Sequence, residues 1–540
     1  MSRKTAVYTV NIDRMDTDGN GFTYTDDGVK IYAPGTVLGD RVRVRAQQVN
    51  ERLAAAVSTE ILTPSPFRRE PQCPYFSDCG GCQLQHMTPE GQEYYKRNQI
   101  IYTLKHFGDI EVGDIDFIRA DEAFRYRNKM IFPFSPEGDW GFYSEHSHNV
   151  IKLNDCLLGD DLNAKILNTV RDFFVAEKLP MYDEIPHTGV LRRVFTRSSS
   201  YSGEIMAVIS VNAENIPHRE RLVFMLRRLS PRITSIILNI NTARTNLALG
   251  SKNVLLYGKE TLTDTLCGLL FEISAHSFFQ INHAQTELLY ARALEYAACD
   301  KDDTVMDIYC GIGTISLAAA KSAKRVIGVE KVSAAIKNAR ENAVRNKIDN
   351  AEFVCSTAAS AVERLIASGE RPDIVILDPP RKGSDEITLG AILRAEPKRI
   401  VYVSCNPRTL ARDLRFLTAG GYTLAAVTGV DLFPQTVHVE TVVLLCRKTP
   451  DDVIKVKLSL DELELTSAES KATYEKIKEY VMKNFGLKVS TLYIAQTKRK
   501  LGIAMGENYN MPKNIESTQP QCPPEKEAAI VKALEHFKMI

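Results

Sequence analysis

The sequence predicts a multidomain α/β protein whose largest part is a doubly wound, Rossmann-like sheet. Its 540 residues are enough for three or four domains, and 44% hydrophobic with 25% charged residues is typical of ordinary globular proteins. Short strand-like runs separated by glycine turns fill the first 60 or so residues. Strand-like and helical runs alternate from about residue 256 to 447, which is the order of a parallel sheet covered by helices.

Four parts are expected along the chain. Residues 1–62 predict a small OB-like β-barrel. Residues 63–255 predict a central β-rich domain, with a helical pattern at 89–107 that could pack on the next domain. Residues 256–447 carry the doubly wound sheet, and residues 455–540 form an α-rich extension. The sequence does not decide whether this extension binds RNA, docks a protein or only packs.

A glycine turn between a strand and a helix predicts a ligand site. The strand-like run Thr304–Tyr309 leads into the turn Cys310–Gly313, and Glu330 ends the next strand. An acidic residue about 20 positions after such a turn can accept hydrogen bonds from ribose hydroxyls. Ser316 stands where a dinucleotide site would have its third glycine, and Asp378–Pro380 follows a buried run. The combination favours S-adenosylmethionine over NAD.

A second candidate feature is a cysteine between a strand and a helix. The run Ile400–Ser404 predicts a buried strand, and Asn406 and Pro407 fit the N-cap and first turn of a helix. Backbone N–H groups and the helix dipole at such a junction favour thiolate over thiol, so Cys405 is a candidate nucleophile. The alternative for a lone cysteine is a small buried residue that closes a strand.

Five motifs follow one another in the chain: Ser277–Asn282, Asp307–Gly311, Asp378–Gly383, Ser404–Pro407 and His438–Thr441. In this order and spacing they resemble the motifs of the RNA uracil-5-methyltransferases, and the resemblance covers roughly residues 1 to 447. It implies that Cys405 is the nucleophile and Glu440 the general base. It also implies that the N-terminal barrel is a TRAM domain, an RNA-binding module. Four residues are implied around the methyl donor: Gln280, Tyr309, Glu330 and Asp378.

The chemistry explains why a thiol and a carboxylate are both needed. Carbon 5 of uracil is too weak a nucleophile to take a methyl group directly. A thiolate that adds at carbon 6 creates an enolate, whose carbon 5 can attack the sulfonium methyl. The proton on carbon 5 must then leave, which requires a positioned base. Glu440 directly precedes the strand-like run Thr441–Cys446 and would meet this need if it faced Cys405.

The cysteines carry a second prediction. The chain has eleven cysteines, an odd number, and no visible signal peptide, which predicts a cytoplasmic protein without structural disulfides. It has no run of 18 apolar residues, so no membrane span is expected. Four of them could form a four-thiolate site, and by themselves they allow zinc or an iron–sulfur cluster. The resemblance to the ribosomal-RNA branch of the family implies a [4Fe–4S] cluster in the central domain. The four candidate ligands are Cys73, Cys79, Cys82 and Cys156.

Net charge gives little support for RNA binding, because 68 basic and 67 acidic residues leave only +1. Local clusters are better candidates for phosphate contacts, although a solvated cationic face is the alternative for each. Arg125, Arg127 and Lys129 would share one face of a strand, whereas Arg408, Arg412 and Arg415 fall at helical spacing beside Cys405. The three clusters are Arg125, Arg127 and Lys129; Arg192, Arg193 and Arg197; and Arg408, Arg412 and Arg415.

The predicted function is S-adenosylmethionine-dependent methylation of carbon 5 of uracil in RNA. The expected partner is 23S ribosomal RNA, with no obligate protein partner. Transfer RNA is an alternative substrate. An amino-methyltransferase that uses Asp378–Pro380 is a second alternative, but it leaves Cys405 and Glu440 unexplained. A non-catalytic RNA-binding or redox-sensing protein is a third, and the intact motif set argues against it.

Overall fold

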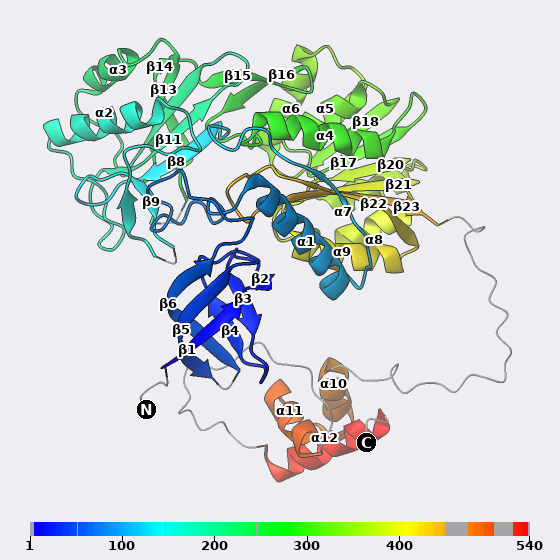
Figure 1. The fold of residues 1–540 in the computed structure, drawn as a ribbon. Helices are drawn as coiled ribbons and strands as arrows, with labels where there is room; N and C mark the ends of the chain where they lie inside the picture. The colour runs from blue at the N-terminus through cyan, green and yellow to red at the C-terminus, as the bar shows by residue number, and fades with distance from the viewer. Residues whose placement is uncertain are drawn as a thin grey trace. The chain divides into compact units, whose positions relative to one another are not determined.

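The computed structural model describes residues 5–448, apart from 51, 146 and 245–246, and residues 474–501 and 522–537 (Figure 1). The chain divides into two compact units, Met1–Pro450 and Asp451–Ile540. The expected start of the C-terminal extension, at residue 455, lies outside the described residues.

The first part of the chain is one six-stranded sheet. All neighbouring strands are antiparallel except β4 and β6, which are parallel. Exposure alternates along β5, so that Val42, Val44 and Ala46 enter a small apolar core. That this sheet is a TRAM domain stays a prediction. The strand order is β1 (Thr5–Asn11), β5 (Arg41–Asn50), β6 (Leu53–Thr63), β4 (Lys30–Ala33), β3 (Gly21–Tyr24) and β2 (Arg14–Met15).

A second sheet occupies the middle of the chain. One of its faces packs against α2 (Asn163–Ala176) and α3 (Arg219–Arg227), and the other contacts a hairpin of β15 (Thr261–Leu266) and β16 (Leu269–Ser274). A short pair, β9 (Gly141–Tyr143) and β10 (Val150–Lys152), lies beside it. The strand order is β14 (Lys252–Gly258), β13 (Ile233–Ile240), β12 (Ile205–Val211), β11 (Leu191–Ser198) and β8 (Lys129–Pro133).

The third sheet has eight strands. Its first five are parallel, whereas β23 runs antiparallel to both of its neighbours. In order the strands are β19 (Ala351–Cys355), β18 (Arg325–Glu330), β17 (Thr304–Ile308), β20 (Ile374–Leu377), β21 (Arg399–Ser404), β23 (Glu440–Arg447), β22 (Tyr422–Val430) and β7 (Asp116–Ile118).

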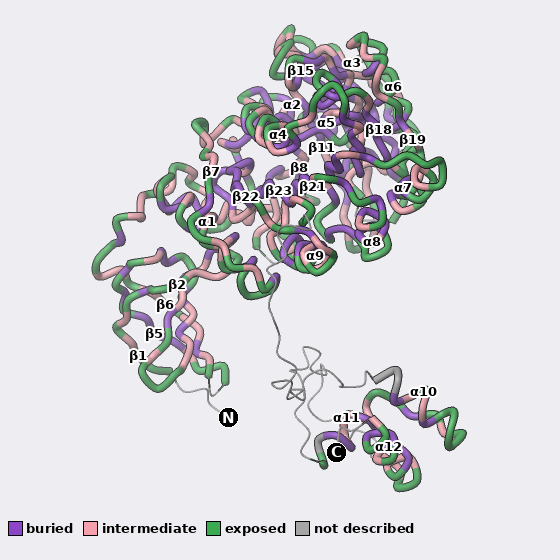
Figure 2. Tube along the Cα trace, turned by 90° about the vertical axis from the view of Figure 1, so that its right-hand side faces the viewer, coloured by how far each residue is buried: buried purple, intermediate pink, exposed green. Residues whose placement is uncertain are grey.

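Helices cover both faces of this third sheet. Along β20, Ile374 and Ile376 contribute to one core and Val375 and Leu377 to the other, so the strand is buried on both sides. Strand β18 of the same sheet is likewise buried along most of its length (Figure 2). The expected doubly wound α/β fold is confirmed. The first core receives α4 (His283–Ala297), α5 (Thr314–Ala320) and α6 (Ser333–Arg345), and the second receives α1 (Pro89–Gly108), α7 (Ala358–Ala367), α8 (Glu386–Ala395) and α9 (Pro407–Ala419).

Two segments that precede the central sheet belong to this third sheet in space. Strand β7 pairs in parallel with β22, and α1 buries Ile100 and Leu104 in the same core as α9. The stretch expected as one central domain, residues 63–255, therefore also contributes a helix and an edge strand to the sheet that carries the site.

The C-terminal unit is helical in its described part. Helices α10 (Tyr474–Phe485), α11 (Thr491–Lys500) and α12 (Pro524–His536) share a small apolar core that includes Ile477 and Leu534. No helix in the described ranges of either unit is long and apolar enough to cross a membrane.

Candidate active site

Four predicted site residues lie where the parallel strands end. Tyr309 follows β17, Glu330 is the last residue of β18, Asp378 follows β20 and Cys405 follows β21. Neighbouring strands are paired in register up to these ends. The carboxyl edge of a doubly wound sheet is the place where such folds bind ligands.

The antiparallel strand β23 brings Glu440 to the same edge. Ser404 is paired with Thr441 at the end of the β21–β23 ladder, and Cys405 follows this pair on one strand while Glu440 precedes it on the other. The two side chains are close enough for the charge of Glu440 to raise the pKa of Cys405. Glu440 is buried, whereas Cys405 is partly exposed. The two residues predicted to be catalytic therefore lie side by side.

The thiol of Cys405 is protonated in its resting environment. Burial raises its pKa to about 12, with further contributions from the carboxylates of Glu440 and Asp378, and the guanidinium of Arg381 acts in the opposite direction. The expectation that the helix N-terminus would favour the thiolate is wrong for the resting site. The N–H of Arg408 at the start of this helix is accepted by the Asn406 side chain at 3.0 Å.

The carboxyl groups at this edge also hold their protons more tightly than usual. The pKa of Glu440 is raised well above its ordinary value, mainly by burial and then by the charge of Asp378. Burial raises the pKa of Asp378 to about 7. Burial likewise raises the pKa of Asp307 to about 7, although the hydroxyl of Ser316 donates to it at 2.5 Å. Asp378 and Asp307 can therefore gain or lose a proton near neutral pH, as proton transfer requires.

The glycine turn has room for a methyl donor. Gly311 has a φ of +55°, and a Cβ added there would meet nothing within 4 Å. Oδ1 of the buried Asp307 has no hydrogen-bond partner among the described residues. An open turn beside an unpartnered hydrogen-bond acceptor fits a ligand that carries N–H groups, such as S-adenosylmethionine.

The other residues implied around the donor differ in their surroundings. Tyr309 has a φ of +68°, and its hydroxyl lies 3.1 Å from Oγ of Ser384. Glu330 accepts the N–H of Val332 at 2.9 Å. Gln280 is buried just before α4, where its backbone carbonyl accepts from Asn128 at 2.9 Å.

The sequence did not single out the network behind the site. Asp413, a buried residue of α9, accepts hydrogen bonds from the backbone N–H of Ser384 at 2.8 Å and from the hydroxyl of Tyr402 at 2.6 Å. It also pairs with Arg412, which donates to the backbone carbonyl of Ser384 at 2.9 Å. Arg381, whose charge lowers the pKa of Cys405, lies inside the Asp378–Gly383 motif. Asp413, in contrast, is an aspartate in the middle of a helix, and nothing in the sequence marks it as part of a network behind the site.

Most side chains of the three basic clusters bind other groups of the protein. They are therefore weaker candidates for phosphate contacts than a free cationic face would be, and phosphate binding by the clusters stays a prediction. Arg408 lies 4.5 Å from the ring centre of Phe107, and Arg408 and Arg415 are exposed. The engaged residues are Arg125 with Asp155, Arg192 with the carbonyl of Asn241, Arg193 with Glu184, Arg197 with the carbonyls of Ser274 and Ser277, and Arg412 with Asp413.

Four free thiols gather in the central part of the chain. Cys73, Cys79 and Cys82 come from one loop and Cys156 from the segment after β10. Burial raises the pKa of Cys82 to about 11 and that of Cys156 to about 12, and the neighbouring thiols raise both further. Among the described residues, no group of three or more His, Cys, Asp or Glu side chains is arranged to hold a metal ion. The set of donors fits a thiolate-bound metal or cluster, but the sulfurs do not surround one common point.

The fold and the site define an S-adenosylmethionine-dependent methyltransferase, and comparisons with known proteins agree. A family model described as tRNA (Uracil-5-)-methyltransferase matches residues 246–448. An uncharacterized RNA methyltransferase of Caldanaerobacter subterraneus subsp. tengcongensis is 40% identical over 443 residues, which cover 82% of this chain and 98% of that protein. One from Halalkalibacterium halodurans is 40% identical over 446 residues, covering 82% and 97%.

A solved structure gives the same result. The crystal structure of Pyrococcus abyssi tRNA (uracil-54, C5)-methyltransferase in complex with S-adenosyl-L-homocysteine has 26% sequence identity and a TM-score of 0.66, and the alignment covers 81% of this chain and all of that one. The chain belongs to the RNA uracil-5-methyltransferase family.

Proposed function

We propose that this enzyme methylates carbon 5 of uracil in 23S ribosomal RNA, with Cys405 as nucleophile and Glu440 as general base. The observation that carries the proposal is that Cys405 and Glu440 adjoin the same terminal pair of the β21–β23 ladder, Ser404 and Thr441, at the edge where the donor turn lies and near Asp378. An enzyme that methylates an exocyclic nitrogen needs neither a thiol nor a second carboxylate at this place.

The proposed reaction begins at the thiol of Cys405. The thiol gives up its proton to solvent, and its sulfur forms a bond to carbon 6 of the flipped-out uracil, which moves the ring electrons into an enolate. S-adenosylmethionine is the second substrate: carbon 5 bonds to its methyl group, the bond from that methyl to the sulfonium sulfur breaks, and S-adenosylhomocysteine leaves. Glu440 then removes the proton from carbon 5. The carbon 5–carbon 6 double bond forms again, and Cys405 leaves as a thiolate.

The surroundings of the site suit these steps. A resting thiol with a pKa of about 12 stays protonated until a base and the uracil are both in place. Glu440 is buried among carboxyl groups, so its raised pKa makes it a stronger proton acceptor than an exposed glutamate. Gln280, Tyr309 and Glu330 would hold the donor at the carboxyl ends of the strands.

The ribosomal substrate rests on the resemblance of the four-cysteine site and the N-terminal sheet to the ribosomal-RNA branch. We further propose that Cys73, Cys79, Cys82 and Cys156 hold a [4Fe–4S] cluster. Transfer RNA is the second candidate substrate, because the Pyrococcus abyssi structure is that of a tRNA methyltransferase. Both RNAs would present the uracil in an unpaired loop, where base flipping costs least.

The test uses 5-fluorouridine-containing transcripts of 23S ribosomal RNA and of transfer RNA. With S-adenosylmethionine, the wild-type enzyme should form an adduct that survives denaturation, because fluorine at carbon 5 cannot leave as a proton. Cys405→Ala should form none, and the exposed Cys355→Ala should behave as wild type. An adduct in the Cys405→Ala variant would disprove the nucleophile, and an adduct with transfer RNA alone would reverse the choice of substrate.

A further inference from the structure

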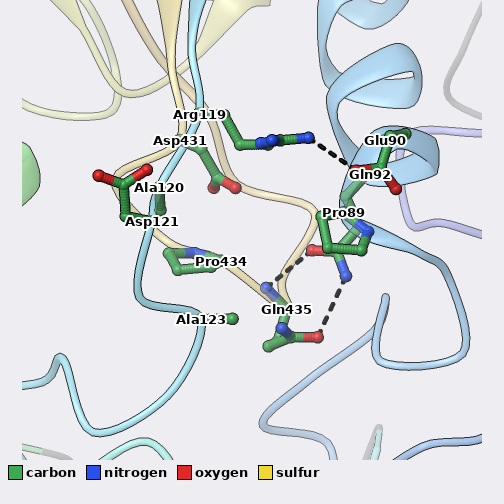
Figure 3. A pocket seen from close by; sticks show the side chains of 10 residues that line it. All are labelled: Pro89, Glu90, Gln92, Arg119, Ala120, Asp121, Ala123, Asp431, Pro434 and Gln435. Carbon is green, nitrogen blue, oxygen red and sulfur yellow. Dashed lines mark hydrogen bonds and ion pairs between the residues drawn. The ribbon is translucent and has the colours of Figure 1, made fainter.

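The loop from Asp431 to Val439 leads directly to Glu440 and is mostly buried, but a pocket lies against one side of it. A pocket of about 200 Å³ lies where this loop meets the start of α1 and residues 119–123 (Figure 3). Asp431, Pro434 and Gln435 of the loop line it. On the pocket side the loop has no packing partner in the described part of the chain, so hydrogen bonds help to hold it there.

Gln435 is the residue of the loop that meets α1. It is 1% exposed and has a φ of +71°. Its backbone N–H donates to Oε1 of Gln92 at 3.0 Å, and its own Oε1 accepts from Nε2 of Gln92 at 3.1 Å (Figure 3). Because each residue both donates and accepts, this reciprocal pair fixes the orientation of both amide side chains.

The same residue is bound to the segment that carries the cysteines. The backbone carbonyl of Gln435 accepts from the N–H of Gln83 at 3.1 Å and from the N–H of Leu84 at 2.9 Å. These two residues directly follow Cys82. The loop that ends at Glu440 is therefore joined to the chain immediately after a proposed cluster ligand.

A side-chain connection runs alongside these backbone bonds. Arg69 donates to Oε1 of Gln435 at 2.9 Å and to the backbone carbonyl of Gln85 at 3.0 Å. Oε1 of Gln85 in turn accepts the N–H of Cys73 at 3.1 Å. We call residues 69–87 the cysteine segment. Its hydrogen bonds to the loop from Asp431 to Val439 end on Gln435, five positions before Glu440.

We propose that Gln435 is a positioning residue for proton removal. Its hydrogen bonds hold the loop that leads to Glu440 against the cysteine segment and α1. This inference rests on the proposed function of Cys405 and Glu440. The nucleophile is held separately, by β21 and α9. Loss of the Gln435 side chain should therefore slow removal of the carbon 5 proton while leaving addition of the thiol nearly unchanged.

Four variants of the full-length enzyme separate this role from a general structural one. Gln435→Gly keeps the positive φ and the backbone bonds but removes the side-chain acceptor. Gln435→Glu keeps an acceptor for Arg69 and should rescue the function. Arg69→Met removes the same bond from the other side and carries the test if the glycine variant does not fold. Lys347→Gly is the matched control, since it places glycine at a φ of +55° on an exposed loop.

The assay uses total RNA from cells that lack the protein and S-adenosylmethionine with a tritiated methyl group. Label that stays on the protein after denaturation and ribonuclease digestion reports the methylated adduct that awaits proton removal. Gln435→Gly and Arg69→Met should hold about fivefold more label than wild type and release it about tenfold more slowly, with the rate of adduct formation within about twofold. Gln435→Glu and Lys347→Gly should match wild type.

Two outcomes would overturn the inference: unchanged label in Gln435→Gly and Arg69→Met, or equal slowing of adduct formation and release. Failure of the proposed function is a distinct result. In that case the wild-type enzyme forms no adduct with either 5-fluorouridine transcript, whatever the Gln435 variants do.

Discussion

Cys405 should react slowly with iodoacetamide in the free enzyme. Burial and the carboxylates of Glu440 and Asp378 raise its pKa to about 12. At pH 8 only about one molecule in 10,000 then carries the thiolate, against about one in four for an ordinary thiol with a pKa near 8.5. Because the thiolate is the reactive form, the alkylation rate should rise about tenfold per pH unit from about pH 7 to pH 10.

The charges around the thiol allow a test of sign. Glu440→Gln and Asp378→Asn each remove a carboxylate that raises the pKa of Cys405, so both should speed alkylation. Arg381→Met removes the cation that lowers this pKa and should slow it. A pKa change of about one unit corresponds to about a tenfold change in thiolate fraction, which sets the size of effect to look for.

Alkylation at each cysteine can be followed by mass spectrometry of the digested protein. The exposed Cys355 serves as the reference inside every sample, because the charge substitutions lie away from its strand, which is at one end of the strand order. Equal rates for Cys405 and Cys355 in the wild-type enzyme at pH 8 would refute the reasoning. So would a common direction of change in all three charge variants.

Three further predictions follow from buried groups. Lys96 is fully buried and donates to Asp431 at 2.6 Å, so Lys96→Met should lower the stability of its unit by about 3–5 kcal/mol, seen as a lower thermal midpoint. Lys96→Met combined with Asp431→Leu should recover most of this loss. Asp413→Asn breaks the network that reaches Tyr309 through Ser384 and should raise the KM for S-adenosylmethionine several-fold without loss of fold. Cys82→Ser should abolish the broad visible absorbance and bound iron of anaerobically purified protein; stoichiometric zinc in the wild type would contradict the cluster.

The sequence contained enough information to predict the family and the doubly wound sheet, because both depend on local patterns. A glycine turn after a buried strand, an acid that ends the next strand and a cysteine before a helix N-cap each occupy a few adjacent residues. In a parallel sheet, strand ends meet at one edge, so the positions of Tyr309, Glu330, Asp378 and Cys405 at successive strand ends were enough to predict that they converge.

The electrostatics of the site could not be predicted in the same way. The helix N-terminus after Cys405 argued for a thiolate, whereas the actual balance depends on burial and on two carboxylates from other strands. The protein partners of the basic clusters could not be predicted for a similar reason. Arg197 shows no sign in the sequence that its guanidinium is satisfied by carbonyls of Ser274 and Ser277, about 80 residues away. Such partners depend on tertiary packing, which local sequence patterns do not reveal.

The reversed direction of β23 is what brings Glu440 to the same site as Cys405. Cys405 follows the last residue of β21, at the carboxyl edge of the sheet, and Glu440 is the first residue of β23. Because β23 is antiparallel, its first residue lies at that same edge. In a parallel arrangement Glu440 would begin at the opposite edge, about 20 Å away at 3.3 Å per residue over the six residues of β21. Glu440 therefore reaches this edge because β23 is antiparallel, and the loop from Asp431 to Val439 must place Glu440, the first residue of that strand, accurately.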